Sequence, residues 1–399
     1  MNAAVFVAGM GVISGIGNNV PENLAALAGS QAGMGDIRYL RTNHRGLLPA
    51  AEVKLSNTEL AKLSGFPHTT SRNVMLSMIA AKEAWDNAGI SDIPALRTGF
   101  VSATTIGGMD KTENFFTDFL PDHSKGKLRD MVYHECSNIT TAVAEKLGIR
   151  HHVSTISTAC SSSANAIMYG ARLIKHNVLD AVIAGGTDAL TRFTLNGFNT
   201  LMIVDEQYCK PFDENRKGLN LGEGAGYVVL VSERVASALK KTPYCSLSGY
   251  CNFNDAYHQT ASSPDGDGPY GAMAGALTMS GLQPPDIDYI NLHGTGTQNN
   301  DSSEGAAIKR LFDPHYPKMS STKSFTGHTL GASAGIEAVF STLAIRDGIV
   351  YPNLRLQTPI AEFPFVPETT FSRHPEIRHV LSNSFGFGGN CSSLIFSKL

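Results

Sequence analysis

The sequence has few charged residues and no run that predicts a membrane span. Asp, Glu, Lys and Arg make up 17% of 399 residues, and the formal net charge is -3. This balance gives no electrostatic reason to expect nucleic-acid or anionic-membrane binding. No apolar run approaches the roughly 18 residues that a span needs. The N-terminal segment lacks the basic residues of a signal peptide. We therefore expect a soluble, cytoplasmic protein without nucleic-acid or membrane partners.

Cysteine is also scarce. The six cysteines are irregularly spaced and form no CxxC pair. A disulfide framework and a structural zinc site are therefore not indicated. A reducing compartment suits these thiols. Hydrophobic residues, by contrast, reach 42%, which is ample for a buried core.

Short apolar, β-branched runs alternate with segments of helical periodicity. This alternation predicts α/β layers around a buried sheet. The strand candidates are residues 5–7, 98–101, 181–186, 227–231, 289–292 and 380–383. Residues 154–160 resemble residues 320–328, and residues 180–186 resemble residues 288–294. These similarities predict a duplicated unit, with halves at 1–247 and 248–399.

Cys160 is the strongest candidate nucleophile. It lies in a small-residue turn, between a short buried strand predicted around Val153 and Ile156 and a helix predicted from about residue 166. A thiol at such a turn faces the N–H groups of the helix N-terminus, which would lower its pKa. Considered alone, however, a lone cysteine is more often an inert buried thiol.

Two histidines lie in glycine-rich turns far along the chain. His293 ends an apolar strand in residues 290–297, and His328 ends residues 321–328. A third strand, residues 383–390, also ends in a glycine loop, where backbone N–H groups can approach a ligand closely. One cysteine and two histidines from distant segments indicate covalent acyl chemistry on sulfur.

These motifs together resemble the elongating, decarboxylating β-ketoacyl-acyl-carrier-protein synthases of the thiolase superfamily. The matching segments are residues 158–162, 211–216 with 222–226, 290–297, 321–328 and 383–390, which occur in the family's order. The resemblance covers residues 4–395 and implies a thiolase-like α/β fold. That fold has duplicated βαβαβαββ halves in α-β-α-β-α layers. The first half would carry Cys160 and the second both histidines.

The resemblance also implies a mechanism. Cys160 would take an acyl group from a phosphopantetheine thioester, and malonyl carrier protein would then lose CO2 to give the attacking carbanion. Neutral His293 and His328 would stabilise the enolate through their Nε2–H groups. The backbone N–H groups of Cys160 and Phe387 would form the oxyanion hole. No tightly bound cofactor is implied.

Four charged residues would support the site. The resemblance assigns Lys323 and Glu337 electrostatic support, although the two could simply form a structural ion pair. Asp301 and Glu304 follow the first histidine motif. We favour a helix-cap and network role for them over an acid–base pair.

The substrate contacts follow from the same resemblance. Thr295 and Thr297 would bind the pantetheine amides. Phe387 and Phe198 would gate the acyl pocket, and Ile106 would line its floor.

Acyl- and malonyl-loaded acyl carrier proteins are the implied partners. The superfamily completes its site across a dimer, so we expect either a homodimer or a heterodimer with a related ketosynthase-like subunit. Residues 134–140 are the segment most suited by position to reach across. Lys125, Lys127 and Arg129 form either a carrier-protein docking patch or a solvated basic loop.

Three departures from the family pattern leave the pathway open. Asn390-Cys391 follows Gly389 where the family usually has Thr-Asn. Residues 218–221 read Gly-Leu-Asn-Leu where many members have Gly-Phe-Val. The first histidine motif carries Thr295-Gly296-Thr297 in place of Thr-Ser-Thr. They suggest a synthase of polyene or polyketide chains rather than the housekeeping fatty-acid enzyme. Two alternatives are a CoA-dependent thiolase with Cys391 as second cysteine, and a non-catalytic partner subunit of the chain-length-factor type. The presence of Cys160 argues against the latter.

Overall fold

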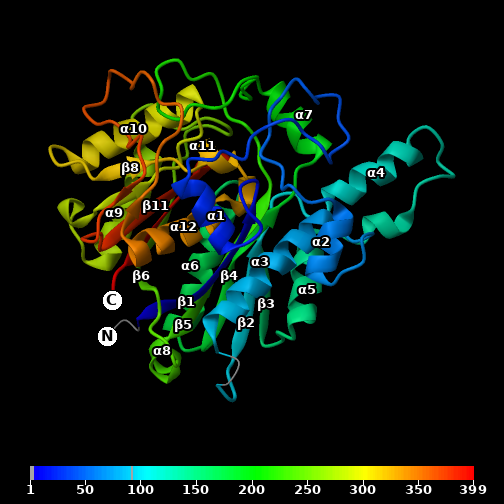
Figure 1. Ribbon diagram of the computed structural model, residues 1–399, viewed down its shortest axis with the longest axis horizontal. Coiled ribbons are helices and arrows are strands. Elements are labelled where there is room, and N and C mark those ends of the chain that lie inside the picture. The colour runs from blue at the N-terminus through cyan, green and yellow to red at the C-terminus, as the bar shows by residue number, and fades with distance from the viewer. Residues whose placement is uncertain (1–3, 91–92) are drawn as a thin grey trace.

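The computed structural model describes residues 4–90 and 93–399, and its centre is a ten-stranded mixed sheet (Figure 1). The strand order is β3-β2-β4-β5-β1-β6-β12-β11-β7-β8. In chain order the strands are β1 (Val5–Ser14), β2 (Thr98–Ala103), β3 (His152–Ile156), β4 (Ala181–Asp188), β5 (Gly224–Ser232), β6 (Cys245–Asn254), β7 (Tyr289–Asn291), β8 (Lys318–Ser320), β11 (His379–Gly386) and β12 (Asn390–Ser397). A separate ribbon pairs β9 (Ile349–Val350) with β10 (Ser372–Arg373).

The sheet consists of two halves with the same topology. In the first half β3, β2 and β4 are parallel, while β5 and β1 are antiparallel to their neighbours. In the second half β8, β7 and β11 are parallel, and β12 and β6 are antiparallel in the same way. A short pairing of β1 with β6 joins the halves. The predicted duplicated α/β fold is confirmed.

Helices form three layers around these half-sheets. The helices α3 (Arg72–Ala88) and α5 (Cys136–Leu147) cover the first half, and α9 (Asp267–Ser280) covers the second, with α10 (Gln298–Phe312) packed on α9. Between the halves lie α6 (Ser162–Lys175) and α12 (Ser333–Asp347), each in contact with strands of both. A Cβ at Gly335 would lie 2.3 Å from the Gly226 carbonyl oxygen, so this glycine lets α12 approach β5.

The remaining described helices are shorter than these. They are α1 (Val20–Ala28), α2 (Asn57–Ser64), α4 (Met109–Phe119), α7 (Arg192–Thr200), α8 (Glu233–Ala238) and α11 (Lys323–Thr326), with 3₁₀ turns at Leu128–Met131, Pro284–Asp286, Leu330–Ala332 and Phe387–Gly389. Figure 1 shows α4 extending away from the body of the molecule. Within residues 4–90 and 93–399, no helix has the length and apolarity needed to cross a membrane.

All the predicted strands are present, but one expectation about burial is wrong. We expected a buried strand around Val153, and β3 is instead the outermost strand of its half, with Val153 40% exposed. An edge position cannot be read from a short apolar run. The division at residue 248 stays a prediction, and it falls inside β6.

Candidate active site

Cys160 lies in a tight turn between β3 and α6. The preceding residue, Ala159, has φ +52°, a left-handed conformation that costs energy outside glycine. Ser162 holds the turn, because its hydroxyl accepts from Thr158 N–H at 2.8 Å and donates to the Ala159 carbonyl at 2.5 Å. The turn therefore places the thiol at the N-terminus of α6.

His328 approaches the thiol from the other half of the chain. Its Nε2 atom lies 3.0 Å from Cys160 Sγ, and its Nδ1 atom lies 3.0 Å from Ser333 Oγ on α12. Both Cys160 and His328 are buried. Gly327, just before the histidine, has φ +63°, and a Cβ there would lie 2.8 Å from Leu221 O, so the turn requires glycine.

His293 stands next to His328 with their ring planes nearly perpendicular. The two ring centroids are 5.3 Å apart, and the His293 ring also contacts the Phe385 ring at 5.7 Å. Glu304 fixes the His293 turn. Its two oxygens accept the N–H groups of His293 at 2.9 Å and Gly294 at 2.8 Å. The structure thus brings Cys160, His293 and His328 together.

Asp301 organises the next part of the same turn. Its carboxylate accepts the N–H groups of Thr295 at 3.0 Å and Phe212 at 2.8 Å, and lies 3.7 Å from the Arg216 guanidinium. The residue that caps α10 is Thr297, whose hydroxyl accepts from Asn300 N–H. Of the expected helix-cap and network role of Asp301 and Glu304, the cap part is wrong, because Thr297 caps α10. Both carboxyl groups instead accept from backbone N–H groups of the histidine turn, as a network role implies.

Lys323 and Glu337 form a buried ion pair behind the histidines. Lys323 Nζ lies 2.5 Å from Glu337 Oε1, and the side chains are 1% and 4% exposed. Burial raises the pKa of Glu337 to about 7, against the lowering effect of Lys323.

Burial dominates the titration of the central groups. It raises the pKa of the Cys160 thiol to about 12, although the Lys323 charge and the Phe387 N–H lower it. The lowered thiol pKa expected from the helix N-terminus is therefore wrong, because desolvation of the thiolate outweighs it. Burial and the Lys323 charge hold the pKa values of His293 and His328 well below 6.5, so both rings are neutral at pH 7.

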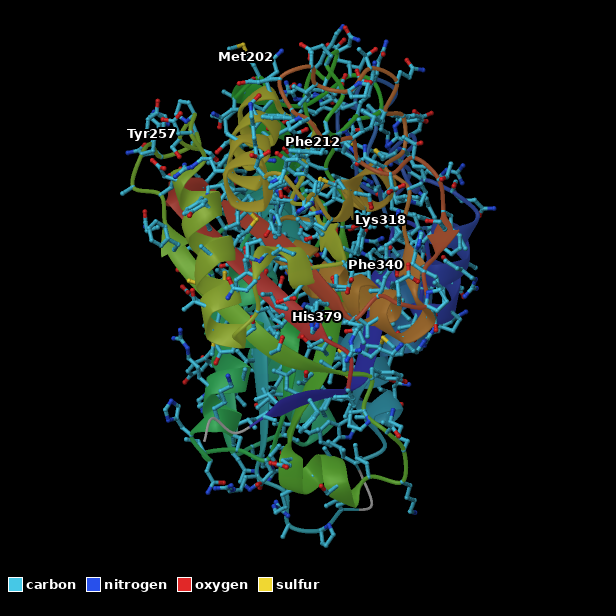
Figure 2. The ribbon with its side chains drawn as sticks, turned by 90° about the vertical axis from the view of Figure 1, so that its left-hand side faces the viewer. Met202, Phe212, Tyr257, Lys318, Phe340 and His379 are labelled. Atoms are coloured by element: carbon cyan, nitrogen blue, oxygen red, sulfur yellow. The ribbon has the colours of Figure 1, made fainter. Side chains whose placement is uncertain are left out.

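A cavity of about 290 Å³ opens onto these groups. It is lined by Cys160, Phe198, Met202, Ile203, Lys217, Leu219, Thr260, Ala261, Ser262, His293, Thr295, Thr297, Gln298, Asn299, Asn300, His328, Phe385, Gly386, Phe387 and Gly389. The rings of Phe198 on α7 and Phe387 stack with centroids 5.8 Å apart. Figure 2 shows Met202 at one end of the molecule with its side chain pointing outward, and this residue is 88% exposed.

Two expected residues lie elsewhere among the described residues. Ile106 is buried in the core cluster of the first half and does not line this cavity. Cys391 is buried in a small cluster with Ala272 and Phe385, and it is also absent from the lining. The thiolase alternative, which needs a second cysteine at the site, is therefore not favoured.

Two polar residues near the site were not predicted from the sequence. Ser333 lies five residues after His328, at the start of α12, and contacts its Nδ1 atom. Asn390 was noted only as a departure from the family pattern, yet its side chain bonds to Ser161 and Asn165 of the Cys160 segment. In the sequence, Ser333 is recognisable only as a serine five residues after His328, near the start of a helix.

Sequence comparison agrees with this geometry. The profile of the β-ketoacyl synthase N-terminal domain matches residues 2–236, and that of the C-terminal domain matches residues 244–357. The chain belongs to the β-ketoacyl synthase family. The expected enzyme class, an acyltransferase of the elongating ketosynthase type, is confirmed with it.

Three relatives illustrate the breadth of this similarity. The chain is 34% identical to a 3-oxoacyl-[acyl-carrier-protein] synthase 2 of Coxiella burnetii, over 99% of this chain and 98% of the relative. The ishigamide ketosynthase/chain length factor structure matches with a TM-score of 0.94 and 28% identity, over the whole of both chains. A ketosynthase in complex with its chain length factor from Xenorhabdus doucetiae matches with a TM-score of 0.86 and 30% identity, covering 100% and 98% of the chains.

Proposed function

We propose that this β-ketoacyl synthase condenses malonyl-acyl carrier protein with an acyl chain held as a thioester on Cys160. The observation that carries the proposal is the 3.0 Å contact of Cys160 Sγ with His328 Nε2, in one cavity with His293. The Phe387 N–H also faces the sulfur. A thiol, two neutral histidines and a backbone donor are the groups that this chemistry needs.

Acylation of Cys160 neither releases nor consumes a proton overall. The Cys160 sulfur bonds to the thioester carbonyl carbon, the bond to the pantetheine sulfur breaks, and the thiol proton ends on the departing pantetheine. The N–H groups of Cys160 and Phe387 bind the oxyanion that develops between these events. The thiol pKa of about 12 makes the protonated cysteine the resting state.

Condensation uses the two histidines. Malonyl carrier protein loses CO2, and the enolate oxygen accepts from the Nε2–H groups of His293 and His328. Ser333 supports this tautomer of His328, because its hydroxyl can donate to Nδ1 and leave the proton on Nε2. The enolate carbon forms a bond to the acyl carbonyl carbon, the bond from that carbon to Cys160 Sγ breaks, and the expelled thiolate takes up one proton from water.

The supporting residues divide between electrostatics and substrate contact. The Lys323–Glu337 pair places a lysine charge behind the histidines, and this charge adds to burial in keeping both rings neutral. Thr295 and Thr297, whose hydroxyls lie 2.9 Å apart, line the cavity where pantetheine amides would bind. The stacked Phe198 and Phe387 rings would gate the acyl pocket. Ile106 as its floor remains a proposal without support from this cavity.

Acyl carrier protein and a second ketosynthase-like subunit are the proposed partners. One similar structure is titled as a type II polyketide acyl carrier protein in complex with its ketosynthase, and two others pair a ketosynthase with a chain length factor. The segment formed by α4 and the 3₁₀ turn after it presents Phe116, Leu120 and Leu128 to solvent, at 40%, 67% and 77% exposure, as a dimer contact would require. All six cysteines are free thiols, which fits a cytoplasmic location.

Mass spectrometry of Cys160 after incubation with acyl-loaded carrier proteins tests the proposal. We expect a single acyl adduct on Cys160, which a C160A variant loses together with condensation. A C391A variant is the matched control and should keep the adduct, because that thiol does not reach the cavity. An adduct that persists in C160A would refute the proposal.

A further inference from the structure

One side-chain oxygen has three hydrogen-bond donors around it beside the Cys160 turn, and one of them, the Ser161 hydroxyl, also lies 2.8 Å from the Thr158 carbonyl oxygen. Asn390 Oδ1 lies 2.6 Å from Ser161 Oγ, 2.9 Å from Asn165 Nδ2 and 2.7 Å from Asn252 Nδ2. Ser161 and Asn165 belong to the start of α6, whereas Asn252 lies on β6. A single acceptor therefore joins both halves of the duplicated fold.

This oxygen connects the two backbone segments that would bind the reacting carbonyl. Ser161 directly follows Cys160, and Asn390 comes three residues after Phe387 at the start of β12. The N–H groups of Cys160 and Phe387 are the proposed oxyanion donors. Their separation depends on how firmly the two segments are held against each other.

Both segments adopt backbone conformations that need outside support. Ala159 has φ +52° on the cysteine side, and Gly388 and Gly389 both have φ +76° on the phenylalanine side. Ser384 Oγ fixes the Cys160 carbonyl from β11 at 2.9 Å. The Asn390 oxygen holds the opposite, helical side of the turn. Without it, the left-handed turn could relax relative to the glycine loop.

We propose that Asn390 is a positioning residue that sets the distance between the Cys160 and Phe387 N–H groups. The inference rests on the proposed function, in which these groups bind the thioester oxyanion. Oxyanion donors act over a narrow range of about 2.7–3.1 Å, and loss of one costs roughly 10²- to 10³-fold in rate. Loosening the pair should cost less, on the order of 10-fold.

The test separates carbonyl chemistry from simple thiol reactivity. In the full chain, in its purified assembly, the rate of Cys160 acylation by acyl-pantetheine thioesters is compared with its alkylation by iodoacetamide. Alkylation displaces iodide at a saturated carbon and forms no oxyanion. We expect N390L, which lacks the acceptor, to acylate about 10-fold more slowly and to alkylate within about two-fold of wild type. N390D keeps the acceptor and should recover most of the acylation rate.

Two further variants guard against a folding defect. S161A removes a donor to Asn390 and should show the same selective loss, whereas N252A leaves both bonds to α6 and should behave as wild type. Unchanged acylation in N390L, or an equal loss of acylation and alkylation in N390L and S161A, overturns the inference. A wild-type chain that is not acylated on Cys160 contradicts the proposed function instead.

Discussion

His328 Nε2 lies 3.0 Å from Cys160 Sγ, although 168 positions separate the two residues in the chain. The contact places a group from the second half of the duplicated fold against the nucleophile of the first. The same ring contacts Ser333 on its far side at 3.0 Å. Ser333 does not line the cavity, yet its hydroxyl is placed to orient the His328 ring.

Replacing Ser333 should weaken enolate stabilisation by His328. One hydrogen bond of this kind contributes about 0.5–1.5 kcal/mol, so we expect S333A to decarboxylate malonyl carrier protein roughly 2- to 10-fold more slowly. Alkylation of Cys160 should also respond, because the same Nε2 atom lies 3.0 Å from the sulfur. S341A serves as control, because Ser341 is a buried serine on the same helix whose hydroxyl donates to the Glu337 carbonyl. Equal decarboxylation in S333A and wild type would contradict the tautomer assignment.

The buried histidines should make the protein less stable in acid. The pKa values of His293 and His328 lie well below 6.5 in the folded chain, because burial opposes their protonation. Below pH 6.5 the unfolded chain binds protons that the folded chain does not, so the free energy of unfolding falls as pH falls. Each histidine contributes a slope of up to about 1.4 kcal/mol per pH unit.

Urea unfolding of wild type and of H293N/H328N between pH 7.5 and 5 measures this slope. The double variant should lose less stability on acidification than wild type. Glu304, whose pKa burial raises to about 7, has the opposite sign: its contribution is full below its unfolded value and is lost as pH rises through 7. Since both proteins retain Glu304, the difference between their two slopes of unfolding free energy against pH reports on the histidines alone. Parallel curves would contradict the prediction.

Breaking the Lys323–Glu337 pair should destabilise the core strongly. K323M leaves the buried Glu337 carboxyl without its partner, so this group, whose pKa is already raised to about 7, protonates, and the unpaired polar group typically costs about 1–3 kcal/mol. K323M/E337L removes both charges and should regain much of this stability, measured by thermal unfolding. The double variant should still condense more slowly than wild type, since the Lys323 charge, which adds to burial in keeping the histidines neutral, is gone. Recovery of condensation activity would assign the pair a purely structural role.

Two adjacent glycines offer a matched test of the Phe387 loop. Gly388 and Gly389 both have φ +76°, but a Cβ meets open space at Gly388 and lies 3.0 Å from Ala256 N at Gly389. We expect G388A to cost about 1–2 kcal/mol through backbone strain alone. G389A adds the contact and should also slow acylation of Cys160, because the loop must shift. Equal acylation rates in the two variants would show that the loop position is not critical.

Much of the site was predictable because its signals are local. The glycines at 294, 296 and 327 have positive φ, so these turns leave a mark in the sequence itself. The small residues around Cys160 and the β-branched residues of the strands are likewise visible as local sequence patterns. The resemblance to ketosynthases followed from these short segments in order.

Other features depended on partners that no local pattern reveals. The exposure of Val153 follows from the edge position of β3. The commitment of Asp301 and Glu304 to the histidine turn depends on backbone groups that only folding brings near. Asn390 appeared in the sequence as an unexplained departure, yet its bond to Ser161 spans 229 positions.

The sequence by itself determined the chemistry: a cysteine and two histidines in glycine-rich turns within a duplicated α/β chain. Only the tertiary structure decided the protonation states, because the pKa values of Cys160, His293 and His328 are set mainly by burial. The tertiary structure also decided which side chains from distant segments position the site residues, such as Asn390 beside Ser161. Burial and long-range hydrogen bonds arise only when the two halves pack together, so no single segment of the sequence reveals them.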